Sequence, residues 1–176
     1  MTDVLEALSP HANRIAIGDD LLALLRRIPG TSPLDVMNVR MILEPQAAEL
    51  AATQASELAL SRIREAHEAA IKSVEMEPFE RWDAEFHRRI FASTRNELLT
   101  NLDAMVQLIR NQPPWVELKR RSFSSERRLV YCQEHENLLR ALERRDGHSA
   151  AEAMYIHLDG VAKTLFATRR WTFDVR

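Results

Sequence analysis

Apolar residues recur every three or four positions in each long segment of this chain, and no segment shows the strict alternation of a half-buried strand. Glycine and proline, which interrupt helices, number only four and seven in 176 residues. Alanine, leucine, glutamate and arginine, which favour helix, dominate the composition. The sequence therefore predicts an all-α protein, an antiparallel bundle of about six or seven helices with short loops.

Proline, glycine and polar clusters indicate where these helices should end. Pro45 lies within one apolar pattern, so it should kink that helix or shift its start. Ser56 and Asn96 are predicted N-caps. The segments MEPFE, QPPW and KRRSFSSERR are interpreted as breaks or links. The predicted helices cover residues 19–28, 34–53, 56–74, 79–94, 96–111, 126–145 and 149–168.

Bulk properties exclude several classes of protein. A formal charge of −2 and an isoelectric point near 6.3 argue against a nucleic-acid-binding domain, which normally carries a basic patch. The lone cysteine, Cys132, excludes an internal disulfide framework and fits a reducing compartment such as the cytoplasm. Because there is no apolar run of about 18 residues and no leader pattern, neither a membrane span nor a signal peptide is expected.

The stretch RWDAEFHRRIF places two ionisable residues among apolar ones. A helix rotates by about 100° per residue, so Asp83 lies roughly 40° from His87, and this i, i+4 spacing lets both side chains point at one spot. Both fall inside the apolar arc of the helix, which comprises Phe79, Phe86, Ile90 and Phe91. We therefore expect Asp83 and His87 to face the core.

Two later helices repeat this pattern. His135 lies on a mostly apolar ridge with Leu138 and Leu142, and His157 lies on a ridge with Val161 and Leu165. The other histidines are expected in a loop, on a polar face or at a helix start, and they are His11, His67 and His148. Three histidines and one carboxylate are thus predicted on the inward faces of three different helices.

Buried polar groups need partners, because an unsatisfied one costs about 1–3 kcal/mol. In one interpretation, Asp83 accepts a hydrogen bond from a histidine, and the other histidines bond to backbone or water. In the other, the four groups share a divalent metal, and they are Asp83, His87, His135 and His157. Three neutral imidazoles and a carboxylate suit zinc first, with nickel, manganese or iron as alternatives.

Arg40 adds a cation to the apolar side of its own helix. The apolar face of that helix is predicted to comprise Val36, Val39, Leu43, Ala47 and Leu50. In one interpretation, Arg40 snorkels to the surface or pairs with Glu44. In the other, its guanidinium is a fork that holds a carboxylate beside the metal.

Three blocks of the sequence resemble a known family. VRMILEPQAAELAA, WDAEFHRRIFASTRNELL and EHENLLRALERRDGHSAAEAMYIHL are similar, in order and spacing, to the ligand-binding (FCD) domain of FadR-branch GntR-type transcription regulators, over about residues 34–166. The resemblance implies an all-α bundle, a homodimer, and a small carboxylate effector that contacts Arg40. It also implies a metal site at the positions of Asp83, His87, His135 and His157.

One departure from the family concerns the N-terminal segment. Members usually begin with a winged helix-turn-helix domain, and residues 1–33 lack its pattern. We expect an N-terminal arm and short helix over 1–33, the effector-binding helical domain over 34–170, and a tail over 171–176. The chain is then a fragment of a regulator or a free-standing sensor. It should contact DNA only through a winged helix-turn-helix domain that it does not contain.

The sequence therefore predicts an effector-sensing domain of a transcription regulator, not an enzyme, acting in the cytoplasm. Two alternatives stay open. A metal-dependent enzyme acting on a small carboxylate would use the ion to activate water. However, no HExxH or Glu-x-x-His motif is present, and Glu134 lies about 100° from His135 on their helix. A ligand-free helical interaction module would instead contain the four groups as a satisfied polar cluster.

Overall fold

The computed structural model describes residues 30–167, and its secondary-structure elements are all helices. They are α2 (Pro33–Gln54), α3 (Glu57–Lys72), α4 (Met76–Ser93), α5 (Glu97–Arg110), α6 (Pro113–Ser122), α7 (Ser125–Glu143) and α8 (Gly147–Leu165). No strand occurs within this described range. The predicted all-α bundle is therefore confirmed. The helix predicted over residues 19–28 lies outside the described residues.

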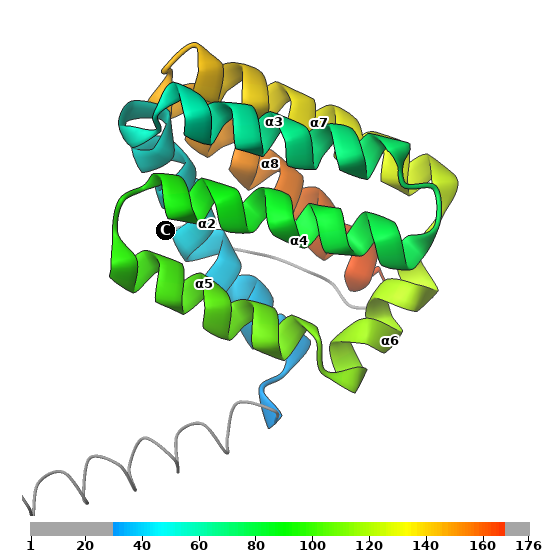
Figure 1. The fold of residues 1–176 in the computed structure, drawn as a ribbon. Helices are drawn as coiled ribbons and strands as arrows, with labels where there is room; N and C mark the ends of the chain where they lie inside the picture. The colour runs from blue at the N-terminus through cyan, green and yellow to red at the C-terminus, as the bar shows by residue number, and fades with distance from the viewer. Residues whose placement is uncertain (1–29, 168–176) are drawn as a thin grey trace, which may run out of the picture. The chain divides into compact units, whose positions relative to one another are not determined.

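The arrangement of the helices places α4 between several neighbours. Figure 1 shows α3, α4 and α5 side by side, with α2 and α8 behind α4. Helix α7 packs against α3 and α8, and the short α6 lies next to α5 and α8. The inward face of α4 is therefore directed at side chains from α2, α7 and α8.

The break predicted at MEPFE is wrong, and the stop predicted at QPPW is confirmed as the end of α5 but also begins a further helix. Pro78 of MEPFE lies in the first turn of α4, where no backbone N–H is required. Pro113 and Pro114 end α5 but occupy the first two positions of α6, which proline favours. Most of the link predicted over KRRSFSSERR therefore belongs to α6 and α7. The predicted N-caps Ser56 and Asn96 are confirmed, since each side chain accepts a bond from the first turn of its helix.

The apolar face predicted for α2 is partly wrong. Val36 and Ala47 are buried, but Val39 and Leu50 are 42% and 41% exposed. Helix α2 also runs from Pro33 through Pro45 without a break, so this proline does not shift its start. The buried side of α2 comprises Val36, Met37, Arg40, Met41, Glu44, Pro45, Ala47, Ala48, Ala51 and Ala52. Two charged residues thus lie in the middle of the buried side.

Large apolar side chains enclose the inward face of α4. Those with almost no exposure include Phe86, Ile90, Leu138, Leu139, Met154 and Leu158. Each such side chain contributes about 1.5–3 kcal/mol when it is fully buried. Polar groups within this surround are consequently shielded from water. None of the described helices is both long enough and apolar enough to cross a bilayer.

Candidate metal centre

Four polar side chains from three helices meet inside this apolar surround. Asp83 and His87 belong to α4, His135 to α7 and His157 to α8. One ligand atom of each residue lies within 4.8 Å of the others. His87 and His135 have no exposure, and Asp83 is only 6% exposed. The structure therefore brings together all four residues that the sequence placed on inward faces.

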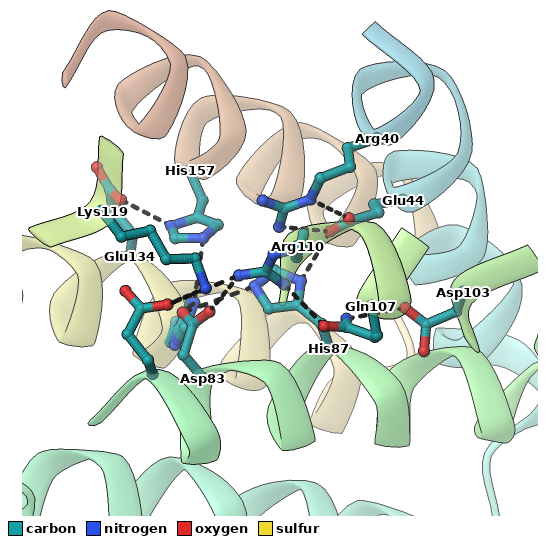
Figure 2. A network of polar contacts seen from close by, with 12 residues as sticks. Arg40, Glu44, Asp83, His87, Asp103, Gln107, Arg110, Lys119, Glu134 and His157 are labelled. Atoms are coloured by element: carbon teal, nitrogen blue, oxygen red, sulfur yellow. Dashed lines mark hydrogen bonds and ion pairs between the residues drawn. The ribbon is translucent and has the colours of Figure 1, made fainter. Parts of the chain in front are cut away.

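The distances within this cluster suit a bound cation. His135 Nε2 lies 3.2 Å from His157 Nε2 and 3.6 Å from Asp83 Oδ1, and His87 Nε2 lies 4.0 Å from the same oxygen. Ligand atoms about 2.0–2.2 Å from a zinc ion lie roughly 3–3.5 Å from one another. All three Nε2 atoms and one carboxylate oxygen thus surround one small space, toward which Figure 2 shows Asp83, His87 and His157 projecting.

Two further carboxylates lie beside the outer nitrogens of two of the histidines. Glu44 Oε2 lies 2.8 Å from His87 Nδ1, and Glu134 Oε2 lies 2.9 Å from His157 Nδ1 (Figure 2). Burial alone would raise the pKa of Glu44, but nearby Arg40 holds it well below its usual range, whereas burial raises the pKa of Glu134 to about 7. In its ionised form each carboxylate only accepts hydrogen bonds and so favours a proton on Nδ1. The lone pair of Nε2 then faces the cluster, as a metal ligand requires.

The protonation states of the inner residues also favour a cation. Burial would raise the pKa of Asp83, but nearby His87 and Arg110 hold it well below its usual range. Burial, followed by the effect of His157, sets the pKa of His135 well below the ordinary value. Burial and nearby His87 lower the pKa of His157 to about 3. The ionised carboxylate of Asp83 and the neutral imidazoles of His135 and His157 are the forms that bind a metal.

A cluster satisfied by its own hydrogen bonds fits these contacts less well. His87 Nε2, which faces the small space, is fully buried and has no hydrogen-bond partner among residues 30–167. The ring of His135 stacks on Phe86, with centroids 4.3 Å apart and planes inclined by 18°. Because an unpaired buried polar atom is costly, the residues fit a divalent cation better than a self-satisfied polar cluster.

Two cationic side chains lie beside the cluster. Arg110 of α5 donates from Nη2 to Asp83 Oδ2 over 3.1 Å, and Lys119 of α6 pairs with Glu80. Burial, followed by the nearby charge of Arg110, lowers the pKa of Lys119 to about 8. Asp83 thus uses one oxygen for the histidines and the other for Arg110. The sequence signalled neither cation, because α6 was not predicted and Arg110 lay at the end of a helix.

Arg40 lies on α2, beside the cluster. Its guanidinium binds both carboxylate oxygens of Glu44, with Nε 2.5 Å from Oε1 and Nη2 3.3 Å from Oε2. This is the Glu44 pair that the sequence allowed, and it is fully buried. Arg40 also lines a small pocket of about 30 Å³ together with Asp83 and His157. The position is therefore compatible with both interpretations of Arg40.

His67 differs from its prediction. It was expected on a polar face, but it is only 2% exposed and packs against the back of the cluster. Its ring lies edge-on to His135 at 6.3 Å between centroids, and its Nε2 is 3.2 Å from Glu136 Oε2. His67 is therefore a neighbour of the cluster and does not belong to the four converging residues.

Gly160 makes room for one of the outer carboxylates. A Cβ at this position would lie 3.2 Å from Glu134 Oε1. Gly160→Ala should therefore push Glu134 away from His157 and weaken metal binding by about 10-fold, as expected for a disturbed outer partner. The metal-free protein should be no less stable, because alanine favours helix over glycine. Zinc titration and thermal unfolding would measure both; unchanged zinc affinity would contradict this role of Gly160.

Family comparisons agree with this architecture. A family model described as the FCD domain matches residues 35–160. The Exu regulon transcriptional regulator of Escherichia coli is 27% identical over 134 residues, which are 76% of this chain and 52% of that protein. The Uxu operon transcriptional regulator of the same species is 31% identical over 137 residues, 76% of this chain and 53% of the relative. The chain spans about half the length of the curated relatives it matches.

Solved structures share the fold at low sequence identity. Escherichia coli McbR/YncC gives a TM-score of 0.68 at 14% identity, over 76% of this chain and 64% of that one. Streptococcus agalactiae GntR gives 0.59 at 18% identity, over 78% and 59%. These similarities concern the helical architecture alone.

Proposed function

We propose a function from the premise that the chain belongs to the FCD domain family, whose model matches residues 35–160. In this proposal it is the effector-sensing domain of a GntR-type transcription regulator, and it binds a divalent metal and a small carboxylate inside the helical bundle. The observation that carries the proposal is the buried cluster with four ligand atoms within 4.8 Å of one another. Relatives named as regulators of the Exu regulon and the Uxu operon support the regulatory role.

The proposed metal ligands are Asp83, His87, His135 and His157. Zinc is the first candidate, because it accepts nitrogen and oxygen ligands in a tetrahedral site; nickel, manganese and iron accept similar sets. A divalent cation in this space supplies a Lewis acid that attracts a carboxylate oxygen. Glu44 and Glu134 would orient two of the imidazoles from outside.

The proposed carboxylate site adjoins the cluster. Arg40, Asp83 and His157 line one pocket of about 30 Å³, which has room for about two water molecules, so the side chains around it would have to move to admit an effector. Arg40 supplies a planar fork that suits a carboxylate, although Glu44 occupies that fork in this structure. An effector would therefore share or replace Glu44 as the partner of Arg40.

Signalling would follow from the helices that the site connects. Arg40 belongs to α2, the proposed metal ligands to α4, α7 and α8, and Arg110 to α5. A ligand that contacts several of these helices binds one packing of the bundle more tightly than another. That difference in affinity would shift the positions of attached DNA-binding domains.

A thermal-shift screen tests this function. At about 100 times its Kd, a ligand stabilises the folded state by about 2.7 kcal/mol, which raises the Tm of a chain of this size by roughly 5–10 °C. We expect such a shift from at least one small carboxylate with zinc present, and a much smaller shift after chelation. Recovery of the acid unchanged would distinguish sensing from turnover. A screen in which no carboxylate gives a zinc-dependent shift would contradict the sensor.

Family membership extends the proposal to partners and location. We infer a homodimer that acts in the cytoplasm without enzymatic activity. DNA would be contacted only through a winged helix-turn-helix domain, whose pattern is missing from residues 1–33. The relatives are named as transcriptional regulators, which supports a function without catalysis.

A further inference from the structure

Three buried nitrogen donors that find no acceptor among residues 30–167 belong to residues that line the pocket. They are Arg110 Nε, Trp115 Nε1 and Arg128 Nε, from residues that are 3%, 1% and 9% exposed. Most buried donors in folded proteins are hydrogen-bonded, because an unsatisfied donor is destabilising. Three such donors around one pocket therefore indicate acceptor atoms that a ligand would supply.

The other contacts of these residues hold them in place without using these three atoms. Arg110 Nη2 donates to Asp83 Oδ2, and Arg128 Nη1 donates to the carbonyl oxygen of Ile71, 3.0 Å away at the end of α3. The bond to Ile71 gives Arg128 a structural role, because cations stabilise helix C-termini. The backbone N–H of Trp115 donates to the carbonyl oxygen of Gln112, but its one side-chain donor, the indole N–H, has no acceptor in the described part of the chain. Anchored side chains with a free N–H are suited to bind a ligand.

The charges around the pocket distinguish Arg128 from its neighbours. Arg40 is paired with Glu44, Arg110 with Asp83 and Lys119 with Glu80. Arg127 also lines the pocket, but it is exposed to water. Arg128 forms no ion pair with any carboxylate in the described part of the chain, although it is more than nine-tenths buried. A buried cation without a counter-charge is costly, and a neutral hydroxyl would not balance it. An anionic group of a ligand would balance this charge.

We propose that Arg128 and Trp115 form a distal subsite for a second anionic group of the effector. This inference rests on the proposed function, in which a first carboxylate binds beside Arg40 and the cluster. The effector is then a small acid with an anionic group at each end, either a dicarboxylate or a phosphorylated acid. The guanidinium of Arg128 and the indole N–H of Trp115 supply charge-assisted and neutral hydrogen bonds to the far group.

Calorimetric titration of the zinc-loaded full chain tests this subsite. Succinate, glutarate and adipate are each compared with the monocarboxylate of the same length, and phosphoglycolate is compared with glycolate to separate phosphate from carboxylate. Gluconate serves as an acid with many hydroxyls but a single charge. We expect one doubly anionic acid to bind about 10- to 100-fold more tightly than its singly charged counterpart.

Two substitutions test which residues cause the preference for doubly anionic acids. Arg128→Met should remove most of it, and Trp115→Phe, which retains most of the ring, should weaken the doubly anionic acid by about 2- to 10-fold. Neither should change the affinity for zinc or for singly charged acids. Arg121→Met is the control, because Arg121 is an exposed arginine of α6 that pairs with Glu117 and does not line the pocket. Circular dichroism would verify that each variant is folded.

Several outcomes would contradict the proposed subsite without contradicting the proposed sensor function. These are equal affinities for singly and doubly charged acids, gluconate binding as tightly as the best doubly charged acid, and an unchanged preference in both folded variants. Zinc binding without affinity for any of these acids would overturn the subsite together with the carboxylate part of the proposed function. If Arg128→Met fails to fold, an undiminished affinity in Trp115→Phe contradicts the inference.

Discussion

His135→Ala protein is expected to bind zinc at least about 100-fold more weakly than the unsubstituted chain, because loss of a direct ligand exceeds the 10- to 100-fold cost of losing an outer partner. His135 Nε2 lies 3.2 Å from His157 Nε2 and 3.6 Å from Asp83 Oδ1, so it is central to the proposed ligand set. Elemental analysis after dialysis would measure metal content, and zinc titration against a competing chelator would measure affinity.

His67→Ala is the matched control for this substitution. His67 is equally buried and its ring touches that of His135, so both substitutions remove an imidazole from the same region. Its nitrogens are not part of the proposed ligand set. The His67→Ala chain should therefore retain one metal per chain. Equal metal content in both variants would remove His135 from the ligand set, and no metal in any form of the protein would contradict the site.

A stability measurement extends this test. A metal that binds only the folded chain stabilises it by about 2.7 kcal/mol at a free concentration of 100 times its Kd. Chelation should therefore lower the Tm of the unsubstituted chain and of His67→Ala, but not that of His135→Ala. A Tm that does not respond to chelator in a zinc-containing sample would mean that the ion lies elsewhere.

Helical periodicity could predict the four converging residues of the site, because the direction of each side chain follows from its angular position on its own helix. Asp83 and His87 are one turn apart, and any regular helix directs both to the same side. His135 and His157 lie on apolar ridges, and burying those ridges in one core brings them to α4. The same method failed for α2, where alanines, Arg40 and Glu44 form the buried side and larger apolar residues are exposed. A helix with few large side chains gives a weak periodic signal.

The outer part of the site depends on contacts between helices, which a single sequence does not reveal. Glu134 lies about 100° from His135 on α7, yet its carboxylate meets His157 of α8. Glu44 was considered only as a partner of Arg40, whereas it also contacts His87 of α4. Trp115 and Lys119 reach the pocket through α6, a helix hidden by its two leading prolines. Each of these residues contributes to the site through side chains that belong to other helices.

Glu44→Ala is expected to lower the free energy of unfolding by about 3–5 kcal/mol, because it leaves a buried guanidinium without its carboxylate. Glu44 and Arg40 are 1% and 2% exposed. Urea denaturation in the presence of chelator would measure the effect without any contribution from metal. Glu117→Ala is the control, since its carboxylate binds two arginines on the exposed side of α6 and should matter little. Similar losses in both variants would contradict the special cost of the buried pair.

The double substitution Arg40→Leu with Glu44→Leu separates the structural role of this pair from its proposed role in sensing. With both charges removed, most of the lost stability should return, because apolar residues of similar volume often replace buried ion pairs without penalty. Zinc affinity should still fall by about 10- to 100-fold, since His87 loses the carboxylate at its Nδ1. The zinc-dependent shift with a carboxylate effector should disappear even at zinc concentrations that saturate the variant. A stable double variant that keeps this shift would mean that the effector is held by other cations of the pocket and that Arg40 serves only to bind Glu44.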